Sequence, residues 1–497
     1  MKEKTEKFTK YLLITLLIIM PILDMRFFFS RVTTLTEVLI ILFCLLLTLI
    51  TNKTSRKSFI KLFIYYCICL IYLIINYYRS SNFISYYENN FNYSLYRETL
   101  TIIKLMMPIT LYFILKNMNI NKRIYNNIIL YWSIFISSSI IITDIFKIGY
   151  SSYGDQIITY NIFGWKKNIY YIYTACKGFF NYANQESCVL LMLLIINIYN
   201  YIYNNKKNIV IIFLLSISMI ILGTRTSTIG GLLLFVFLII FSIIYNLIKK
   251  VKIKNRIAFL TIPVVLWILI IPISPYKNRN LELNIDRDST GITNIKDEKI
   301  ITNENSKVKK ETKTSKEVEV EKTKEDLLRE YFDSYVNNDV LPEMFYKNYY
   351  SYYNDPEFWV DFIKKNNVNG INYRLIEISI IKRVKEVNNN KYDTLFGISN
   401  SRIQNIVNIE RDFVLHYYAY GIIGSLILLS PYIYLLFNLI ILCIKKRKIN
   451  YIYILGVLSI YILSCILTGN ILNYLTCSVP LIFIYNGINI KKNNISY

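Results

Sequence analysis

Long apolar blocks alternate with short polar stretches along most of this chain. Each block is long enough to cross a bilayer as a helix, which takes about 20 mostly apolar residues. The strands of an outer-membrane barrel would be only about ten residues long and would alternate in polarity. The pattern therefore predicts an all-α polytopic membrane protein with about 12 transmembrane helices, and it excludes a soluble enzyme. The expected spans cover residues 11–28, 33–51, 59–77, 99–116, 125–146, 187–204, 209–223, 228–248, 257–274, 414–443, 451–468 and 474–490.

One long polar insertion, residues 275–413, interrupts this pattern after nine expected spans in residues 1–274 and before three more in residues 414–497. Residues 280–326 are rich in Lys, Glu, Thr and Asn and poor in large apolar residues, which predicts a disordered linker. In residues 327–413 apolar side chains recur at intervals of three and four, so we expect several short amphipathic helices there. The Tyr-rich part of this second segment has two interpretations: stacking on sugar rings, or anchoring at the membrane interface.

The basic residues indicate an orientation. The chain has 57 Lys and Arg against 33 Asp and Glu, a net charge of +24, but the insertion holds 23 basic and 24 acidic residues. The excess therefore lies in the membrane part, in short connections that all fall on one side when the N-terminus is cytoplasmic. By the positive-inside rule, both termini face the cytoplasm and the insertion lies outside. The charge favours contact with anionic lipids rather than with nucleic acid.

The eight cysteines predict neither a disulfide framework nor a zinc site, because none lies in the insertion and most fall inside apolar blocks. We expect no metal and no cofactor. The first apolar block follows a basic head without a small-residue cleavage site, so it is expected to stay as a span.

Charged residues inside spans are costly, so those present are the best pointers to function. They lie at the outer ends of the expected spans, whereas the inner halves are nearly free of charge. This distribution suggests a polar cleft that opens to the outer face, and basic residues such as Arg31 and Lys104 would suit an anionic ligand there. The alternative for each residue is a side chain that reaches the interface. The residues are Asp24, Arg26, Arg31, Glu37, Arg97, Glu98, Lys104, Asp144, Glu186 and Arg225.

The segment GTRTSTIGG, Gly223–Gly231, places Arg225 in a very short outer turn before hydroxyl residues that begin a span. A helix N-terminus offers free N–H groups, and Arg adds a bidentate donor. The combination suits a phosphate or diphosphate. A Thr-capped helix start beside an interfacial Arg is the alternative.

Where the insertion returns to the membrane, Glu410, Asp412 and the only histidine, His416, lie within seven residues of one another. Asp412 and His416 are four apart and share a helix face. A carboxylate beside a histidine can act as an acid/base pair. His416 could equally be a polar residue tolerated at the interface. The following Gly421 and Gly424 suit close helix packing.

These features and their order resemble the O-antigen ligase and polysaccharide polymerase family of bacterial membrane glycosyltransferases. Members show a Ser/Thr–Arg pair opening a span, as in Thr224–Arg225, and a long outer loop with an Arg early in a helix, as in Arg374. A Leu-Phe-Gly-Ile-Gly-like turn follows, partly matched by LFGIS at Leu395–Ser399, and then an acidic or His-bearing patch leads into a Gly-Ile-Ile-Gly span, matched by Glu410–Gly424.

The resemblance implies that an undecaprenyl-pyrophosphate-linked glycan is joined to a glycan or lipid acceptor at the outer face of the bacterial cytoplasmic membrane, without metal. Arg225 and Arg374 would bind the pyrophosphate and Glu410 would be the base, with Asp412 or His416 as alternates. Arg402 and Arg411 would make lesser contacts to an anionic glycan. The resemblance also allows a flippase or a chain-length regulator as a protein partner.

Two departures concern the base. Ligases of this family place a His where this chain has Glu410, and many members have an aromatic residue where Glu377 and Ile378 follow the loop Arg. These differences favour a polymerase-like branch over a lipid A ligase. Two rival functions stay open. One is a membrane glycosyltransferase that uses polyprenyl-phosphate sugars, with Asp24 as its catalytic acid. The other is a flippase or transporter of lipid-linked oligosaccharides.

Overall fold

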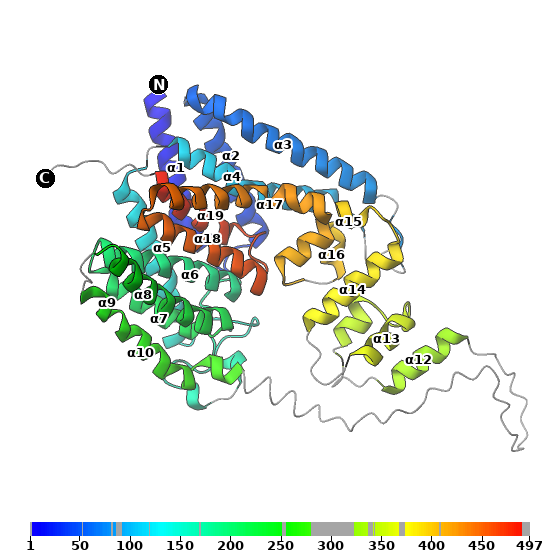
Figure 1. The fold of residues 1–497 in the computed structure, drawn as a ribbon. Coiled ribbons are helices and arrows are strands. Elements are labelled where there is room, and N and C mark those ends of the chain that lie inside the picture. The colour runs from blue at the N-terminus through cyan, green and yellow to red at the C-terminus, as the bar shows by residue number, and fades with distance from the viewer. Residues whose placement is uncertain are drawn as a thin grey trace, which may run out of the picture.

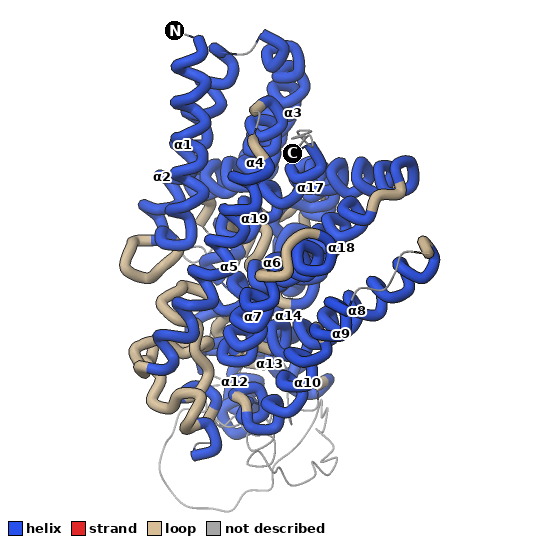
Figure 2. The backbone as a smooth tube through the Cα atoms, turned by 90° about the vertical axis from the view of Figure 1, so that its left-hand side faces the viewer, coloured by secondary structure: helices blue, strands red, loops and turns tan. Residues whose placement is uncertain are grey.

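The computed structural model describes residues 2–51, 53–80, 83–85, 92–118, 120–167, 170–250, 255–279, 323–335, 341, 343–366, 373–406 and 409–489. The regular elements in these ranges are helices (Figures 1 and 2), as the apolar blocks predict. The linker expected at 280–326 lies outside the described residues, apart from its last four.

The twelve apolar blocks each contain helix. Nine helices in the described ranges are long and apolar enough to cross a membrane, those at 208–222 and 475–488 are shorter, and the helix at 2–23 is not among the nine. The all-helical membrane fold is thus confirmed, while the count of twelve spans stays a prediction. The helices are α1 (Lys2–Leu23), α2 (Ser30–Thr51), α3 (Lys53–Ser80), α4 (Leu95–Asn117), α5 (Lys122–Ile145), α6 (Ala183–Tyr203), α7 (Asn208–Leu222), the π-helix η3 (Thr226–Gly230) with α8 (Gly231–Ile248), α9 (Asn255–Phe259) with α10 (Thr261–Ile270) and η4 (Ile271–Ile273), α17 (Asp412–Lys446), α18 (Ile449–Leu467), and α19 (Leu475–Tyr485) with η6 (Asn486–Asn489).

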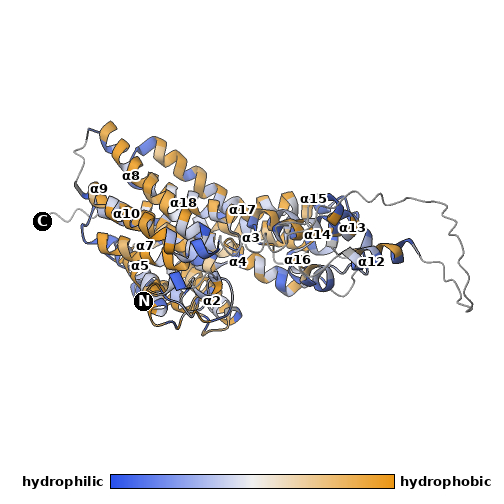
Figure 3. Ribbon diagram, turned by 90° about the horizontal axis from the view of Figure 1, so that it is seen from below, coloured by the Kyte–Doolittle hydropathy of each residue, from blue (hydrophilic) through white to orange (hydrophobic). Residues whose placement is uncertain are grey.

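Helix α6 lies at the centre of the bundle, with 83% of its apolar stretch buried, and it packs against α5, α7, α18 and α19. Helices α3 and α8 lie at the periphery. The ribbon of α8 is coloured mostly as hydrophobic (Figure 3), and Leu233 and Phe237 of α8 and Phe63 and Ile71 of α3 are each more than half exposed. Apolar side chains that face outward are what a helix in contact with lipid requires.

The polar insertion carries short helices that lie beyond one end of the bundle (Figure 1): α12 (Lys324–Tyr335), the π-helix η5 (Met344–Tyr349), α13 (Pro356–Lys365), α14 (Tyr373–Asn388), α15 (Asp393–Phe396) and α16 (Asn400–Ile406). The Tyr-rich stretch helps to build their core. Tyr346 and Tyr352 are buried against Phe332, and the indole of Trp359 donates to the Tyr350 carbonyl at 2.7 Å. These rings therefore pack inside the loop module.

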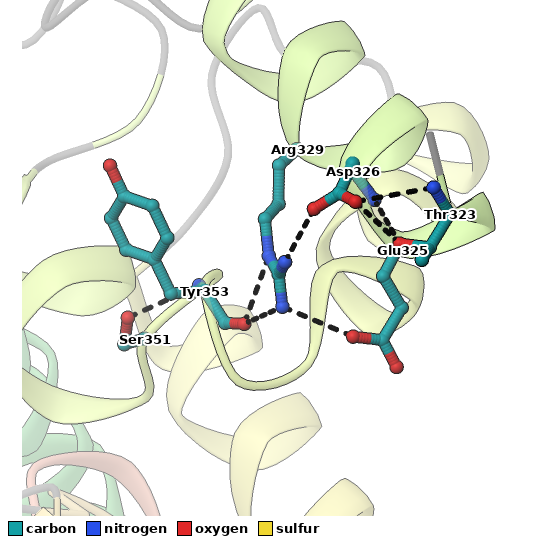
Figure 4. A network of polar contacts seen from close by, with 6 residues as sticks. All are labelled: Thr323, Glu325, Asp326, Arg329, Ser351 and Tyr353. Atoms are coloured by element: carbon teal, nitrogen blue, oxygen red, sulfur yellow. Dashed lines mark hydrogen bonds and ion pairs between the residues drawn. The ribbon is translucent and has the colours of Figure 1, made fainter. Parts of the chain in front are cut away.

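The start of α12 is attached to the Tyr-rich stretch through Arg329 (Figure 4). Its guanidinium donates to the Tyr353 carbonyl at 2.8 and 3.2 Å and pairs with Glu325 and Asp326 one turn earlier. The connection fixes α12 onto the aromatic core.

A pair of glycines joins the loop module to the membrane bundle. Gly397 and Gly421 both have positive φ, 77° and 65°, and a Cβ on either would collide with the backbone of the other's segment. The N–H groups of Ile398 and Ser399 donate to the carbonyls of Tyr418 and Ala419. The span expected to be continuous is therefore broken at Gly421, because the LFGIS turn uses carbonyls that the helix would otherwise bond.

The same junction is held by α3. The Tyr72 hydroxyl donates to the carbonyls of Phe396 and Tyr420, at 2.9 and 3.0 Å, and a Cβ on Gly424 would collide with the Tyr72 ring. Close helix packing at Gly424 is as expected.

Candidate active site at the base of the loop

An ion pair connects the loop to the bundle at the point where the insertion ends. Arg374, the second residue of α14, donates from Nε and Nη2 to Oε2 of Glu410 at 3.0 and 2.6 Å. Its third nitrogen, Nη1, donates to the Leu467 carbonyl at the end of α18, at 3.2 Å. Both side chains are about one third exposed, so a ligand can reach them. The structure thus brings together two residues that the sequence separates by 36 positions.

The backbone of Glu410 is held by the turn between α18 and α19. Gly469 has a φ of 72°, and its α-carbon lies so close to the Glu410 carbonyl that no side chain would fit. Asp412 completes this attachment, because its Oδ2 accepts from the N–H groups of Ile471 and Leu472 at 2.9 and 3.1 Å. A buried carboxylate that accepts two backbone N–H groups fixes the geometry of a turn. Asp412 is therefore a support for Glu410.

Glu377 is a second carboxylate that the sequence did not single out as a site residue. It follows Arg374 by three positions on α14, so the two side chains share a helix face. Glu377 also accepts a hydrogen bond from the backbone of Glu410. Partial burial raises the pKa of Glu377 to about 7, and the Glu410 carboxylate adds to the rise while Arg374 opposes it. The signal in the sequence that could have identified Glu377 is its i, i+3 spacing from Arg374.

Arg279 is a further cation beside this pair. Its guanidinium lies over the ring of Tyr153, 4.3 Å from the centroid, and near the ring of Tyr171, at 5.5 Å. It also interacts electrostatically with Glu410. The signal in the sequence was an Arg just after an apolar block, on the side where the positive-inside rule disfavours it.

Arg225 follows a turn that contacts Tyr171, the ring that also lies near Arg279. It precedes η3, its side chain is exposed, and the hydroxyl of the neighbouring Thr224 accepts from the Ser227 N–H at 3.0 Å. Thr224 thus caps the helix start. The Tyr171 hydroxyl donates to the Leu222 carbonyl of the same turn at 3.4 Å. Tyr171 therefore contacts both the Arg279 guanidinium and the turn that precedes Arg225.

The first turn of α6 connects the two halves of the site. The Ser187 and Thr224 hydroxyls are 2.8 Å apart, and the side-chain amides of Asn184 and Gln185 donate to the carbonyls of Thr468 and Asn470. One helix end therefore contacts both the Arg225 turn and the turn that holds Glu410.

The other predicted site residues have different surroundings. His416 is fully buried with its ring 5.2 Å from that of Tyr420, and Arg402 is buried in α16 with its guanidinium over the Phe83 ring at 4.4 Å. Burial lowers the pKa of Arg402 to about 10, and the nearby Glu98 and Asp393 carboxylates oppose this shift. Lys104 interacts electrostatically with Glu37 of α2. The side chains of Arg31 and Arg411 are exposed, at the starts of α2 and α17.

Several charged residues at span ends connect loops to the bundle. The Glu98 carboxylate accepts from the Ser401 N–H at 2.5 Å, Asp144 accepts from the Ile162 N–H at 2.9 Å, and Arg97 donates to Asn405 at 2.6 Å. Asp24 is half-buried and accepts from the Thr476 hydroxyl at 2.9 Å. These charges stabilise the fold at the end of the bundle where Arg374 and Glu410 lie.

An all-helical bundle with apolar outward faces, and with an Arg-rich, carboxylate-bearing site under a polar loop, defines a multi-span membrane protein with its site at one membrane boundary. A family model described as O-antigen ligase like membrane protein matches residues 5–493. The chain therefore belongs to the O-antigen ligase like membrane proteins, a family of membrane enzymes in surface polysaccharide assembly that act on lipid-linked glycans. The comparisons found no matching curated protein and no matching solved structure.

Proposed function

We propose that this protein polymerises undecaprenyl-pyrophosphate-linked oligosaccharide repeat units on the outer face of the bacterial cytoplasmic membrane. The observation that carries the proposal is the Arg374–Glu410 pair at the base of the loop, with Arg279 next to it. Cations that bind a diphosphate and a carboxylate that accepts a proton are what glycosyl transfer from such a donor requires.

The acceptor hydroxyl oxygen forms a bond to the anomeric carbon of the donor sugar, and the bond from that carbon to the phosphate oxygen breaks. The lipid diphosphate leaves with the electron pair, and the hydroxyl proton passes to a carboxylate. Arg225, Arg279 and Arg374 stabilise the charge that develops on the diphosphate, because fixed cations at a developing anion lower the barrier.

We assign the role of proton acceptor to Glu377. Oε2 of Glu410 already accepts two bonds from Arg374, so Glu410 orients that guanidinium and remains the alternative base. A pKa of about 7 suits a general base that works near neutral pH, since it balances the ionised fraction against basicity. Asp412 then acts as support behind Glu410, and His416, fully buried against Tyr420, is not assigned a part in the proton transfer.

The orientation follows the basic connections: the termini are cytoplasmic and the site opens outward. Single cysteines in place of Lys166 and Lys206, both exposed, test this in a variant without the native thiols. A membrane-impermeant thiol reagent added to intact cells should label only the first. Labelling of only the second would reverse the orientation.

The decisive experiment compares Arg374→Ala with Lys382→Gln, an exposed residue on the same helix, in a strain whose own gene is deleted. Arg374→Ala should leave single repeat units on their lipid carrier at the outer face, and Lys382→Gln should give polymer of full length. Full-length polymer from Arg374→Ala would refute the proposed function. Repeat units that accumulate at the inner face would instead indicate a flippase.

A further inference from the structure

The segment between α5 and α6 meets a row of three cations, Arg26, Lys177 and Arg279, of which the proposed reaction uses only Arg279. It is built by backbone pairing: the Lys177 N–H donates to the Tyr150 carbonyl, the Tyr150 N–H to the Gly178 carbonyl, and the Ser151 N–H to the Gln156 carbonyl, at 2.7–2.9 Å. The connection after α1 joins its edge, since the Arg26 N–H donates to the Phe179 carbonyl at 2.9 Å. Residues 26, 150–157 and 175–180 thus form one small platform.

Three cations contact three consecutive residues of this platform. Arg279 lies over the ring of Tyr153, the ammonium of Lys177 donates to the Gly154 carbonyl at 3.0 Å, and Arg26 pairs with Asp155 at 2.8 Å. Successive Cα atoms are about 3.8 Å apart, so the three anchoring points span only about 8 Å.

The charge of this row is not balanced by its partners. Asp155 is the carboxylate that pairs with Arg26, and it is 80% exposed, so it gives little compensation. Lys177 is only 4% exposed, and its ammonium donates to a neutral carbonyl, that of Gly154. Burial, together with repulsion from Arg26, lowers the pKa of Lys177 to about 8. A buried ammonium kept beside another cation is costly, and an anion between them would remove the cost.

Aromatic rings line the same row. Arg26 lies over the Tyr150 ring at 4.6 Å, and Tyr153 and Tyr171 are 5.5 Å apart and both border Arg279. The row begins at the site, because Arg279 interacts with Glu410. Rings and cations that lead away from the transfer site fit an extended, partly apolar chain with acidic groups better than they fit a lipid headgroup alone.

We propose that the glycan is anionic and that Arg279, Lys177 and Arg26 bind its carboxylate or phosphate groups along the Tyr153–Asp155 turn. This inference rests on the proposed function, since it names the substrate class of that site. Arg279 serves both the diphosphate and the first acidic group, whereas Lys177 and Arg26 contact only the glycan.

The first test is chemical analysis of the polysaccharide that disappears when the gene is deleted. It should contain at least one uronate or phosphate group in every repeat unit. A neutral polymer would overturn the inference and leave the proposed function intact. A deletion that removes no polymer would instead overturn the proposed function.

The second test uses Arg26→Gln and Lys177→Gln, with Lys166→Gln as the matched control from an exposed position of the same segment. The protein is reconstituted in phosphatidylcholine vesicles with its lipid-linked repeat unit. Each site variant should raise the KM for the repeat unit about tenfold, the loss of one charge-assisted contact, at nearly unchanged kcat, and the control should match the wild type. Folding is monitored by size-exclusion chromatography, and Arg26→Gln alone suffices if Lys177→Gln misfolds.

Anionic lipid is the competing source of charge. If the Arg26 variant matches the wild type in phosphatidylcholine vesicles and differs only when phosphatidylglycerol is added, the cations bind lipid and the inference fails.

Discussion

Glu377→Gln tests the assignment of the proton acceptor. The substitution keeps the shape of the side chain and its place beside Arg374 and Glu410 but removes its basicity. General-base catalysis contributes about 10²–10⁴-fold to a rate, so kcat should fall by about that factor. Binding of the lipid-linked donor should change little, because the cations that hold the diphosphate are intact.

The pH dependence gives the sharper result. With the pKa of Glu377 raised to about 7, about half of the side chains are ionised at pH 7 and about one tenth at pH 6. The rate of the wild type should therefore rise nearly tenfold between pH 5 and 6, less steeply through pH 7, and level off above pH 8. The rising limb should be absent in Glu377→Gln.

Glu410→Gln is a second substitution, and it should shift the pKa of Glu377 in a known direction. It removes the like charge that raises the pKa of Glu377 and frees Arg374 to attract it, so the rising limb should move to lower pH. The assay is initial-rate polymerisation in vesicles, with Glu386→Gln on the same helix as control. A rising limb that persists in Glu377→Gln, or that stays in place in Glu410→Gln, would refute the reasoning.

Stability supplies an independent readout. A carboxyl group whose pKa is raised on folding binds its proton more tightly in the folded protein, so its stabilising contribution is present below about pH 4.5 and is lost as the pH rises through about 7. Glu377→Gln should consequently raise the Tm at pH 8 relative to the wild type and change it little at pH 4. A lower Tm at pH 8 would show that the carboxylate has a structural role instead.

Three other outcomes are expected. Gly397→Ala should lower the free energy of unfolding by about 3 kcal/mol or more, because it combines a positive φ with a backbone collision; Gly456→Ala, whose Cβ meets only an ordinary contact at 3.9 Å, should be nearly neutral by thermal unfolding in detergent. Asp412→Asn should lower the free energy of unfolding by about 1–3 kcal/mol, since the two N–H groups of the α18–α19 turn that share its Oδ2 lose a charged acceptor; an unchanged Tm would contradict its role as a support. Polymerisation in vesicles should continue at an unchanged rate in EDTA, and its loss, restored by Mg²⁺ or Mn²⁺, would show that a metal takes part.

The apolar blocks predict the helices well, because in lipid the backbone must bond within each segment and long apolar stretches leave it no other regular structure. The order of the short motifs was likewise enough to predict that Arg374 and Glu410 belong to one site. The structure joins them in an ion pair. Both inferences depend on local composition or on a short pattern.

The features that sequence patterns missed depend on segments far apart in the chain. Gly421 appears helical by pattern, and its break is visible only once the LFGIS turn takes up the carbonyls before it. Arg279 becomes part of the site through the rings of Tyr153 and Tyr171, more than a hundred positions away. Charges at span ends gave a signal of function, yet Glu98 and Asp144 use theirs to hold loop backbone.

The two glycine contacts, Gly397 with Gly421 and Gly469 with Glu410, have a consequence for turnover. They hold the LFGIS turn against α17 and the Glu410 carbonyl against the α18–α19 turn, with no room for a side chain at either contact. In the proposed polymerisation, a new repeat unit enters and the old one shifts after every bond. The closeness of both contacts predicts that this side of the site keeps its shape during that shift.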